Sequence, residues 1–336
     1  MKPIKVYACY NKCDKVRLNS SSGAIFSALA EYVINNHGIV YGVTMSEDCK
    51  SAIFISTTDL NGVNKMRGSK YMQAKIGDTF NNVKADLQSG KMVLFTGTGC
   101  QINGLKKFLG ENYKNLICMD LVCHGVPSPA LWKKYVEYQE KRYNGKLKKI
   151  NFRCKDENWF NFGMKEIIDN CSYEKEEKIY ISKDTDAFMQ MFLRNYCLRP
   201  SCYDCVAKKM QMSDLTVADF WGINNVAPEM NDGLGTSLVL IRSNLGENVF
   251  NAIAPKLNIK EVTYKAGVSE NPAEYKSCER PPQRVDFFSD MNQMSFETLK
   301  IKYASPVEYS LSTQLIIKLK KTIKSIIQQI VFFCRE

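Results

Sequence analysis

The sequence predicts an α/β fold, in which a mixed sheet is flanked by helices and followed by a C-terminal helical tail. Three observations predict it: short apolar runs that end at glycine or polar residues, amphipathic stretches between them, and a strand–helix–strand unit over residues 93–122. In this unit, residues 93–96 and 116–122 are typical of buried strands, and residues 101–109 of a helix. The apolar stripe of that helix consists of Ile102, Leu105, Phe108 and Leu109. Such units form parallel strands, whose ligands bind at the carboxyl ends.

The other elements follow from alternating apolar residues, which indicate strands, and from helical apolar periodicity. Strands are predicted at residues 4–8, 39–43, 52–56, 148–154, 214–218 and 236–242, with a hairpin over residues 165–181. Helices are predicted up to residue 36, around Val83 and Leu87, and at residues 128–143, 184–196 and 246–257. Ser20, Ser21 or Ser22 is expected to cap the helix that ends at residue 36. Ser128 and Pro129 are expected to begin the helix at residues 128–143.

The composition is that of a globular protein. The chain has 336 residues, of which 45% are hydrophobic and 24% charged, and it can bury a large core. Its N-terminal residues lack the apolar segment of a signal peptide, and no stretch reaches the ~18 consecutive apolar residues of a membrane span. We therefore expect a cytoplasmic protein, whose 13 cysteines stay reduced and serve packing, metal binding or redox chemistry rather than disulfides.

The charge is strongly positive, because 46 basic residues against 35 acidic ones give a net charge of +11. Basic residues are dense at residues 141–149 and 318–324, where they would either attract an acidic partner or form an ordinary solvated cationic surface. Neither run lies in a recognisable nucleic-acid module, so no nucleic-acid function is expected. Residues 306–336 are predicted to form a basic amphipathic helix, and three uses are open: peripheral contact with the inner membrane face, packing on the body, or packing on a second copy in a homo-oligomer.

Two polar loops are candidate ligand contacts. Ser20, Ser21, Ser22 and Gly23 precede a helix whose free N–H groups and dipole can hold a phosphate. Ser69, Lys70 and Tyr71 form a basic loop that can contact a phosphate or the edge of a flavin ring. From spacing alone, an ordinary helix cap and a solvated loop are the alternatives.

The glycine-rich sequence Gly97-Thr98-Gly99-Cys100 is not a dinucleotide-binding fingerprint. The third glycine of G-x-G-x-x-G would fall at Ile102, so a nicotinamide cofactor is disfavoured.

Four cysteines form a candidate metal site. Cys100 and Cys123 follow the two strands of the central unit, and Cys202 and Cys205 form a C-x-x-C turn. One close pair with two single thiols fits a [4Fe–4S] cluster better than zinc, which usually binds two close pairs, and the absence of any metal is the third alternative. His124, beside Cys123, is a candidate to orient that ligand or to relay a proton. The remaining cysteines, Cys278 among them, are expected to be core or surface thiols.

Eight ordered motifs carry a resemblance over roughly residues 6–253. They are SSSGAIFSALA, GSKYMQA, VLFTGTGCQINGLKKFL, DLVCHGVPSPALWKKY, NFRCK, LRPSCYDC, SDLTVADFWG and GTSLVLI. This pattern resembles the coenzyme F420 hydrogenase/dehydrogenase beta subunit family. The resemblance implies a mixed α/β flavoprotein in which FAD exchanges a hydride, with coenzyme F420 as one candidate hydride carrier, and an adjacent [4Fe–4S] cluster handles single electrons.

The resemblance also implies roles for residues. The cluster thiolates would be Cys100, Cys123, Cys202 and Cys205. The flavin contacts would be Ser20, Ser21, Ser22, Gly23, Ser69, Lys70 and Tyr71, with Gly97 and Thr98 beside the first cysteine. Lys70 would stabilise the reduced ring, and His124 would tune the cluster. The chain departs from the family pattern at Ala24, Gly99 and Ala218, where relatives usually have glycine, proline and glycine.

The expected setting follows from the same resemblance. Many relatives carry an N-terminal ferredoxin module that this chain lacks, so a separate ferredoxin or other acidic redox protein is expected as partner. Stand-alone relatives recur among cell-surface polysaccharide genes, which favours a redox step in glycan synthesis. Residues 1–270 would form the flavin and iron–sulfur electron-transfer domain, and residues 271–336 a C-terminal extension. The alternatives are a non-redox glycan-pathway transferase with a structural four-cysteine metal site, and a non-enzymatic scaffold.

Overall fold

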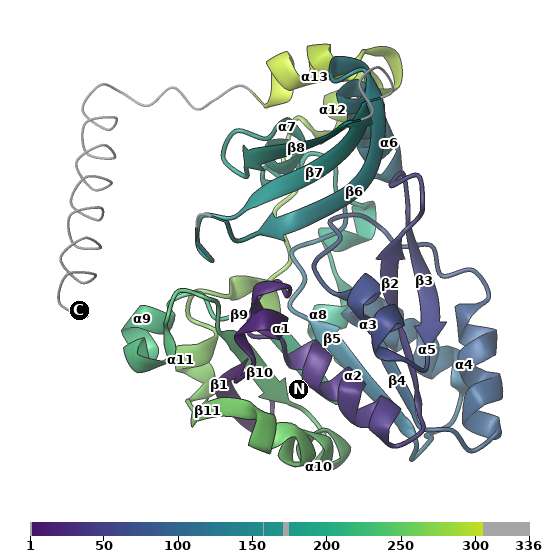
Figure 1. Ribbon diagram of the computed structural model, residues 1–336, viewed down its shortest axis with the longest axis vertical. Coiled ribbons are helices and arrows are strands. Elements are labelled where there is room, and N and C mark those ends of the chain that lie inside the picture. Colours follow the sequence, from purple (N-terminus) through teal and green to yellow (C-terminus); the bar gives the residue numbers. More distant parts are fainter. Residues whose placement is uncertain (1, 157, 171–174, 305–336) are drawn as a thin grey trace.

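The computed structural model describes residues 2–156, 158–170 and 175–304. Its strands form an eight-stranded mixed sheet, in the order β11-β1-β10-β9-β5-β4-β2-β3, and a separate three-stranded antiparallel sheet, β6-β7-β8 (Figure 1). The large sheet contains β1 (Lys5–Asn11), β2 (Ile39–Met45), β3 (Ala52–Thr57), β4 (Val93–Thr98), β5 (Leu116–Leu121), β9 (Leu215–Asp219), β10 (Ser237–Ile241) and β11 (Leu257–Glu261). The small sheet contains β6 (Gly145–Cys154), β7 (Gly163–Asn170) and β8 (Lys175–Ser182).

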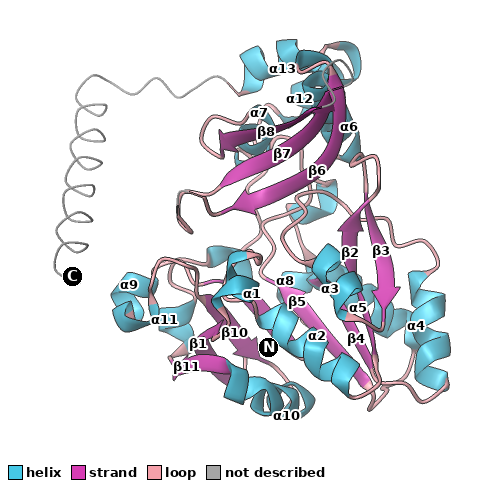
Figure 2. Cartoon of the chain, viewed as in Figure 1, coloured by secondary structure: helices cyan, strands magenta, loops and turns pink. Residues whose placement is uncertain are grey.

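The helices cover both faces of the large sheet and one side of the small sheet (Figure 2). They are α1 (Asp14–Leu18), α2 (Ile25–Asn35), α3 (Leu60–Met66), α4 (Thr79–Gln88), α5 (Gly99–Leu109), α6 (Pro129–Arg142), α7 (Ala187–Leu193), α8 (Val206–Lys209), α9 (Ile223–Val226), α10 (Asn244–Ile253), α11 (Tyr264–Gly267), α12 (Arg284–Gln293) and α13 (Phe296–Tyr303). The predicted class, a mixed sheet flanked by helices, is confirmed.

The centre of the large sheet is parallel, as the strand–helix–strand unit predicts. β2, β4, β5 and β9 pair in parallel, whereas β3, β10, β1 and β11 add antiparallel edges. Because successive side chains of a strand point to opposite faces, Leu94 packs in the core shared with α2, α3 and α10, and Val93 and Phe95 pack against α4 and α5. Burial of each such side chain contributes about 2 kcal/mol. The carboxyl ends of β4 and β5 are thereby fixed at one edge.

Two local predictions on this sheet were wrong. Phe108 of α5 is 45% exposed, although it continues the apolar stripe, because it lies at the rim beside Phe80 at a ring distance of 5.8 Å. None of the three serines caps α2: the N-cap is Ala24, in the left-handed region with φ 66°. Ser20 Oγ and Ser22 Oγ instead donate to backbone carbonyls of Val16 and Thr236, at 2.8 Å each, so their hydroxyls tie down the loop.

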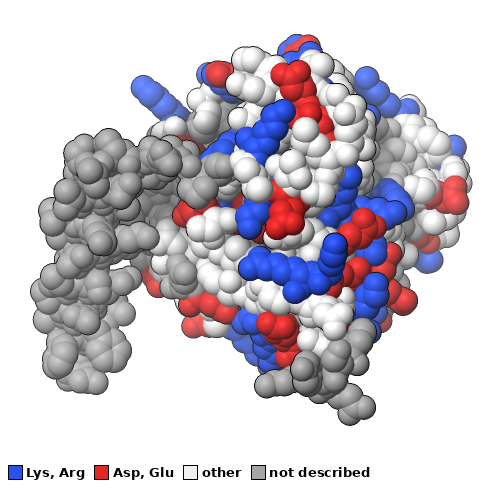
Figure 3. All heavy atoms as spheres, turned by 90° about the horizontal axis from the view of Figure 1, so that it is seen from above, with Lys and Arg blue, Asp and Glu red and all other residues white. Residues whose placement is uncertain are grey.

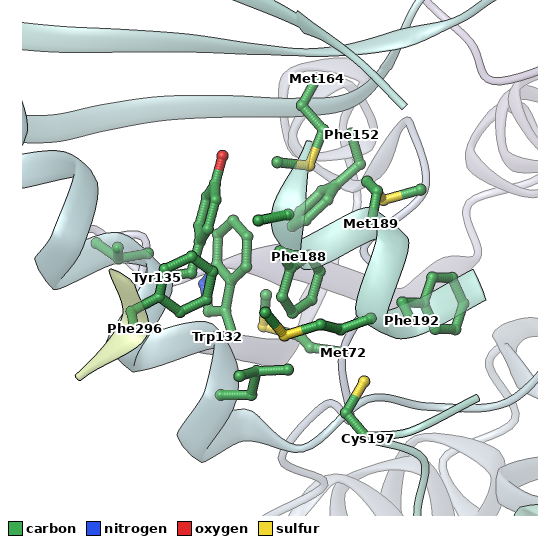
Figure 4. Close-up of a cluster of buried hydrophobic side chains, with 14 of the residues drawn as sticks. Met72, Trp132, Tyr135, Phe152, Met164, Phe188, Met189, Phe192, Cys197 and Phe296 are labelled. Atoms are coloured by element: carbon green, nitrogen blue, oxygen red, sulfur yellow. The ribbon is translucent and has the colours of Figure 1, made fainter. Parts of the chain in front are cut away.

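The small sheet, α6, α7, α12 and α13 form a second unit with its own core. Figure 4 shows its aromatic centre, where Trp132 and Tyr135 of α6 pack with Phe188 of α7. The sequence predicts the strand that became β6 and the hairpin that became β7 and β8. It does not predict their separation into a second sheet, because a strand's own pattern says nothing about which strand it pairs with.

The chain beyond residue 270 returns across the molecule. Residues 271–279 pass along the carboxyl end of β5, and α12 and α13 then pack in the second unit beside α6 and α7. The domain boundary at residue 270 stays a prediction, and the predicted helix over residues 306–336 lies outside the described residues. Within the described part of the chain, all helices are too short or too polar to cross a membrane.

Candidate cofactor and metal-binding site

Two cavities lie side by side at the carboxyl ends of β4 and β5. The first, called here the serine cavity, has a volume of about 310 Å³ and is lined by the serine-rich loops. The second, the cysteine cavity, has a volume of about 330 Å³ and is lined by the four predicted metal-ligating cysteines. The residues common to both linings are Thr98, Gln101, Asp120, Leu121, Val122 and Val126. A ligand in one cavity is therefore separated from a ligand in the other by a single layer of side chains.

The cysteine cavity brings together thiols from three parts of the chain. Cys100 is the second residue of α5, Cys123 follows β5, and Cys202 and Cys205 lie between a short 3-10 turn and α8. A capping box formed by Thr98 and Gln101 fixes the start of α5, and Thr98 Oγ1 lies 3.2 Å from the Cys100 sulfur. The two cysteines predicted at strand ends and the two of the C-x-x-C turn thus line one cavity.

Two of these thiols, Cys123 and Cys202, are made less acidic by burial. Together with a smaller effect of the neighbouring thiols Cys202 and Cys100, burial raises the pKa of Cys123 to about 12. Burial also raises the pKa of Cys202. A bound cation reverses this preference, because it stabilises the thiolate form.

Within the described residues, no group of three or more His, Cys, Asp or Glu side chains is arranged to hold a single metal ion.

A fifth thiol stands at the rim and was missed by sequence analysis. Cys278 donates through its sulfur to the carbonyl oxygen of His124, and Ser277 Oγ accepts a hydrogen bond from the Cys205 amide at 3.0 Å. Lys208 Nζ donates to the carbonyls of Cys123, at 2.8 Å, and Ala273. No local motif marks this segment, which reaches the cavity only through the return of the chain after residue 270.

His124 is held in one orientation beside the cavity. Its Nε2 lies 2.7 Å from Asn195 Oδ1, while Asn195 Nδ2 donates to the carbonyl of Glu279 at 3.2 Å. Because the amide nitrogen already donates, the amide oxygen accepts, and His124 Nε2 carries the proton. Burial lowers the pKa of His124, so the neutral ring is favoured.

The serine cavity contains most of the predicted flavin contacts. Ser20, Ser21, Ser22, Ser69, Lys70, Tyr71, Gly97 and Thr98 all line it. Gly23 lies behind this lining, where its amide donates to Ser237 Oγ at 2.9 Å. A hydrogen bond of 2.9 Å between Ser21 Oγ and Ser69 Oγ joins the two loops. The two loops, which lie 48 residues apart in the sequence, therefore form one continuous surface of the cavity.

The serine cavity is also well suited to an anion. Ile25 and Phe26 belong to the first turn of α2 and line the cavity, where the N–H groups of a helix start have no partner within the helix. Arg67, which sequence analysis missed, lines it too and donates through Nε to Ser27 Oγ at 2.9 Å. Its signal was weak, because a single arginine in a polar loop usually faces solvent.

The amine of Lys70 is occupied by α3. Its Nζ donates to the carbonyls of Met66, at 2.5 Å, and Arg67, at 2.9 Å. Burial lowers the pKa of Lys70 to about 7, while the carbonyl oxygens at the end of α3 favour its charged form. Lys70 thus lines the cavity as an amine whose position is set by α3 and whose protonated and neutral forms both occur near pH 7. Its predicted role toward a flavin ring stays a prediction.

The opposite wall of the serine cavity is tied to the small-sheet unit. Tyr71 packs on Phe152 and Phe192 with ring distances of 5.7 and 5.2 Å. Asp219 accepts hydrogen bonds from Arg153 and, at 3.2 Å, from Trp159 Nε1. The cavity therefore lies where the two units of the molecule meet.

Comparison with known proteins shows the family. Residues 90–267, more than half of the chain, match the family model for the C terminus of the coenzyme F420 hydrogenase/dehydrogenase beta subunit. A solved structure, the F420-reducing [NiFe] hydrogenase complex from Methanosarcina barkeri in a xenon-derivatised form, contains a similar chain with a TM-score of 0.52 and 14% identity. The match covers 90% of this chain and 91% of that one, and it shows a shared fold. A search of curated proteins gave no match. The chain belongs to the coenzyme F420 hydrogenase/dehydrogenase beta subunit family.

Proposed function

We propose that the chain is an oxidoreductase that binds FAD in the serine cavity and a [4Fe–4S] cluster in the cysteine cavity. It would move electrons between a hydride carrier, such as coenzyme F420, and a one-electron partner such as ferredoxin. The observation that carries the proposal is the shared wall: the serine cavity and the thiol-lined cysteine cavity adjoin each other in a member of the coenzyme F420 hydrogenase/dehydrogenase beta subunit family.

The thiol arrangement supports a cluster over a single zinc ion. Zinc draws four ligands to about 2.3 Å from one centre, whereas the thiolates of a [4Fe–4S] cluster bind separate corners of a larger cube. The four thiols that line the cysteine cavity are one close C-x-x-C pair and two single cysteines from separate segments, rather than the two close pairs usual for zinc. Cys100, Cys123, Cys202 and Cys205 would hold the cluster, which supplies single-electron transfer when bound. The neutral, fixed ring of His124 would limit water near Cys123.

The serine cavity supports FAD through two kinds of surface. The start of α2, the serine hydroxyls and Arg67 offer donors to a diphosphate. Val43, Met66, Met119 and Val217 offer an apolar wall to a ring. Lys70 would keep positive charge near that ring, which favours its reduced, anionic form.

An acidic redox partner remains the proposed electron donor or acceptor. The basic run at residues 141–149 lies at the C-terminal end of α6, whose 14 residues span about 21 Å at a rise of ~1.5 Å per residue. Two of its lysines are paired, Lys146 with Glu140 and Lys148 with Asp169. Figure 3 shows basic and acidic side chains interspersed on the face seen from above. The run would therefore steer a partner at low salt rather than contact it at the cavity.

The biological setting is proposed from the resemblance. A redox step in cell-surface polysaccharide synthesis would place the protein in the cytoplasm, with membrane contact through residues 306–336.

Anaerobic purification with iron, zinc and flavin assays tests the function. We expect bound flavin and about four irons per chain. Cys205→Ala should lose the iron, whereas Cys13→Ala, an exposed cysteine outside both cavities, should keep it. Zinc in the cysteine cavity would favour the glycan-pathway transferase, and a chain without flavin or metal would favour the scaffold.

A further inference from the structure

One carboxylate stands in the wall between the two cavities. Asp120 is the fifth residue of β5 and pairs with Gly97 of β4 on one side and Thr216 of β9 on the other. It lines both cavities, yet only 5% of its surface is exposed. In the sequence, Asp120 is a single polar residue within an apolar strand pattern, and no motif marks it as functional.

The surroundings of Asp120 leave one of its oxygens unused. Among the described residues, Oδ1 has no hydrogen-bond partner. A Cβ at position 99 would lie 2.9 Å from Oδ2, so Gly99 leaves room for the carboxyl group. Such a buried acceptor is costly unless it binds a proton or a ligand.

The charged groups around Asp120 come from two other segments. Arg242 after β10 favours the carboxylate, and Glu274 from the returning segment opposes it; these two pair with each other at 3.0 Å. The hydroxyls of Thr216 and Ser213 favour the carboxylate as well. Burial is the largest effect and raises the pKa of Asp120 to about 6, so that it can gain and lose a proton near neutrality.

The other ionisable groups that line the serine cavity are already engaged. Lys70 donates to the carbonyls at the end of α3, and Asp219 accepts hydrogen bonds from Arg153 and Trp159. Arg67 remains protonated at all relevant pH values. Burial raises the pKa of Tyr71 further above neutrality. Of the described residues in this lining, Asp120 alone combines a free oxygen with a suitable acidity.

The balance of electrons and protons requires such a group. A hydride consists of one proton and two electrons. One-electron carriers remove only the electrons, so one proton is released and needs an acceptor. We propose that Asp120 accepts the proton released when a hydride pair, taken up in the serine cavity, leaves as two single electrons through the cysteine cavity. The inference rests on the proposed function. The electrons reach the one-electron partner, and the proton binds the Asp120 carboxylate.

The cysteine cavity gives that proton a polar route outward. On this side Asp120 shares the lining with Thr216, Gln211 and Glu274. Gln211 Nε2 donates to Glu274 Oε2 at 2.8 Å, and Gln211 is half-buried at the cavity edge. The proton therefore leaves on the side opposite to the hydride carrier.

The test compares Asp120→Asn with wild type in protein carrying both cofactors. After reduction, reoxidation by ferricenium, a one-electron oxidant, is followed by stopped flow from pH 5 to 8. We expect the wild-type rate to rise through pH about 6, and Asp120→Asn to be about 100-fold slower without that rise. Asp186→Asn is the matched control, because Asp186 is an equally buried carboxylate outside both cavities.

A second readout does not depend on turnover. The infrared spectrum of the cofactor-free protein at pH 8 is subtracted from its spectrum at pH 5. The band of the protonated carboxyl group in this difference should be weaker in Asp120→Asn than in the wild type. If Asp120→Asn does not fold, Thr216→Val removes a hydroxyl that favours the carboxylate, and the rise in rate should move to higher pH. Unchanged rates and pH profiles in protein that holds both cofactors overturn the inference alone. Protein that binds no flavin overturns it together with the proposed function.

Discussion

The serine cavity and the cysteine cavity share a wall but are assembled in different ways. The serine cavity is lined by the loops before α2 and after α3, which hydrogen bonds between Ser21 and Ser69 hold together, and by the ends of β4, β5 and β9. The cysteine cavity collects α5, the end of β5 and the turn before α8, and residues 271–279 close it. Both cavities thus collect distant segments, but hydrogen bonds between two loops complete the serine cavity, whereas the returning chain completes the cysteine cavity. Substitutions should therefore be able to damage them separately.

Among the substitutions that should damage one cavity and spare the other, Gly23→Ala is expected to have the largest effect. A Cβ at this position would lie 2.5 Å from the carbonyl oxygen of Cys9 and 2.9 Å from the amide nitrogen of Ser237. Neither backbone atom can move without shifting β1 or β10, so we expect the free energy of unfolding to fall by about 3 kcal/mol. Flavin should be lost, while the four cysteines keep their iron below the unfolding temperature.

Denaturant titration with flavin and iron assays checks this. Gly104→Ala is the control, because its Cβ would make ordinary contact at 3.5 Å with Phe80. If Gly23→Ala were as stable as the wild-type protein, the close packing of Gly23 against β1 and β10 would be contradicted.

The stability of the small-sheet unit, against which Tyr71 of the serine cavity packs, is expected to depend on pH. Tyr135 Oη lies 2.5 Å from Glu166 Oε1 and 2.8 Å from Asp186 Oδ2, and all three residues are buried. One hydroxyl proton cannot satisfy two carboxylates, so one of the carboxyl groups holds a proton of its own. Burial is the main cause that raises the pKa of Glu166 to about 7 and that of Asp186 to about 6.

The sign follows from these two shifts. Both pKa values are higher in the folded chain than in the unfolded one, so the folded chain binds more protons between pH about 4 and 7. The free energy of unfolding should fall by about 2 kcal/mol as the pH rises through this window. Glu166→Gln should flatten the dependence, and Glu137→Gln, on the exposed side of α6, should leave it unchanged. Urea titrations at pH 5 and 8 measure it, and equal stabilities would refute the shared proton.

Ser21→Ala should weaken the serine cavity alone. Ser21 Oγ accepts from the Ser69 amide at 2.8 Å and contacts Ser69 Oγ at 2.9 Å, which joins the two loops. Loss of these contacts should cost about 1 kcal/mol and lower flavin affinity roughly fivefold, without a change in iron content. Fluorescence titration with FAD measures the affinity. Ser269→Ala, an exposed serine outside both cavities, is the control, and equal affinities in the two variants would exclude a role for the bridge.

The smallest effect, and the only stabilising one, is expected from Ala24→Gly. Ala24 has φ 66° at the start of α2, a conformation that glycine adopts without the penalty of a side chain. The free energy of unfolding should rise by about 0.5–1 kcal/mol, with the cavity unchanged. Thermal unfolding at a fixed pH measures it. A loss of stability would show that the methyl group of Ala24, which is buried, contributes more than the strain.

The sequence by itself determined the elements and the chemistry at their ends. The apolar runs around Leu94 and Ile117 predict the parallel pair β4 and β5, because a short buried strand must be apolar on both faces. Cys100 and Cys123 follow those strands, so their approach to each other was predictable from topology alone. The C-x-x-C turn was likewise predictable from its spacing, because a tight turn keeps two thiols together.

Only the tertiary structure decided which distant segments close the site. Glu274 lines the cysteine cavity and Cys278 contacts the His124 carbonyl because the chain returns after residue 270, and no periodicity encodes such a return. Asp120 looks like any polar residue in a strand until β9, Gly99 and Glu274 enclose it and leave Oδ1 without a partner among the described residues. Even the serines, correctly placed beside a helix start, bond to Val16 and Thr236 rather than cap it. Local patterns fix what a segment can form, but the acidity and the neighbours of a buried group are set by every segment packed around it.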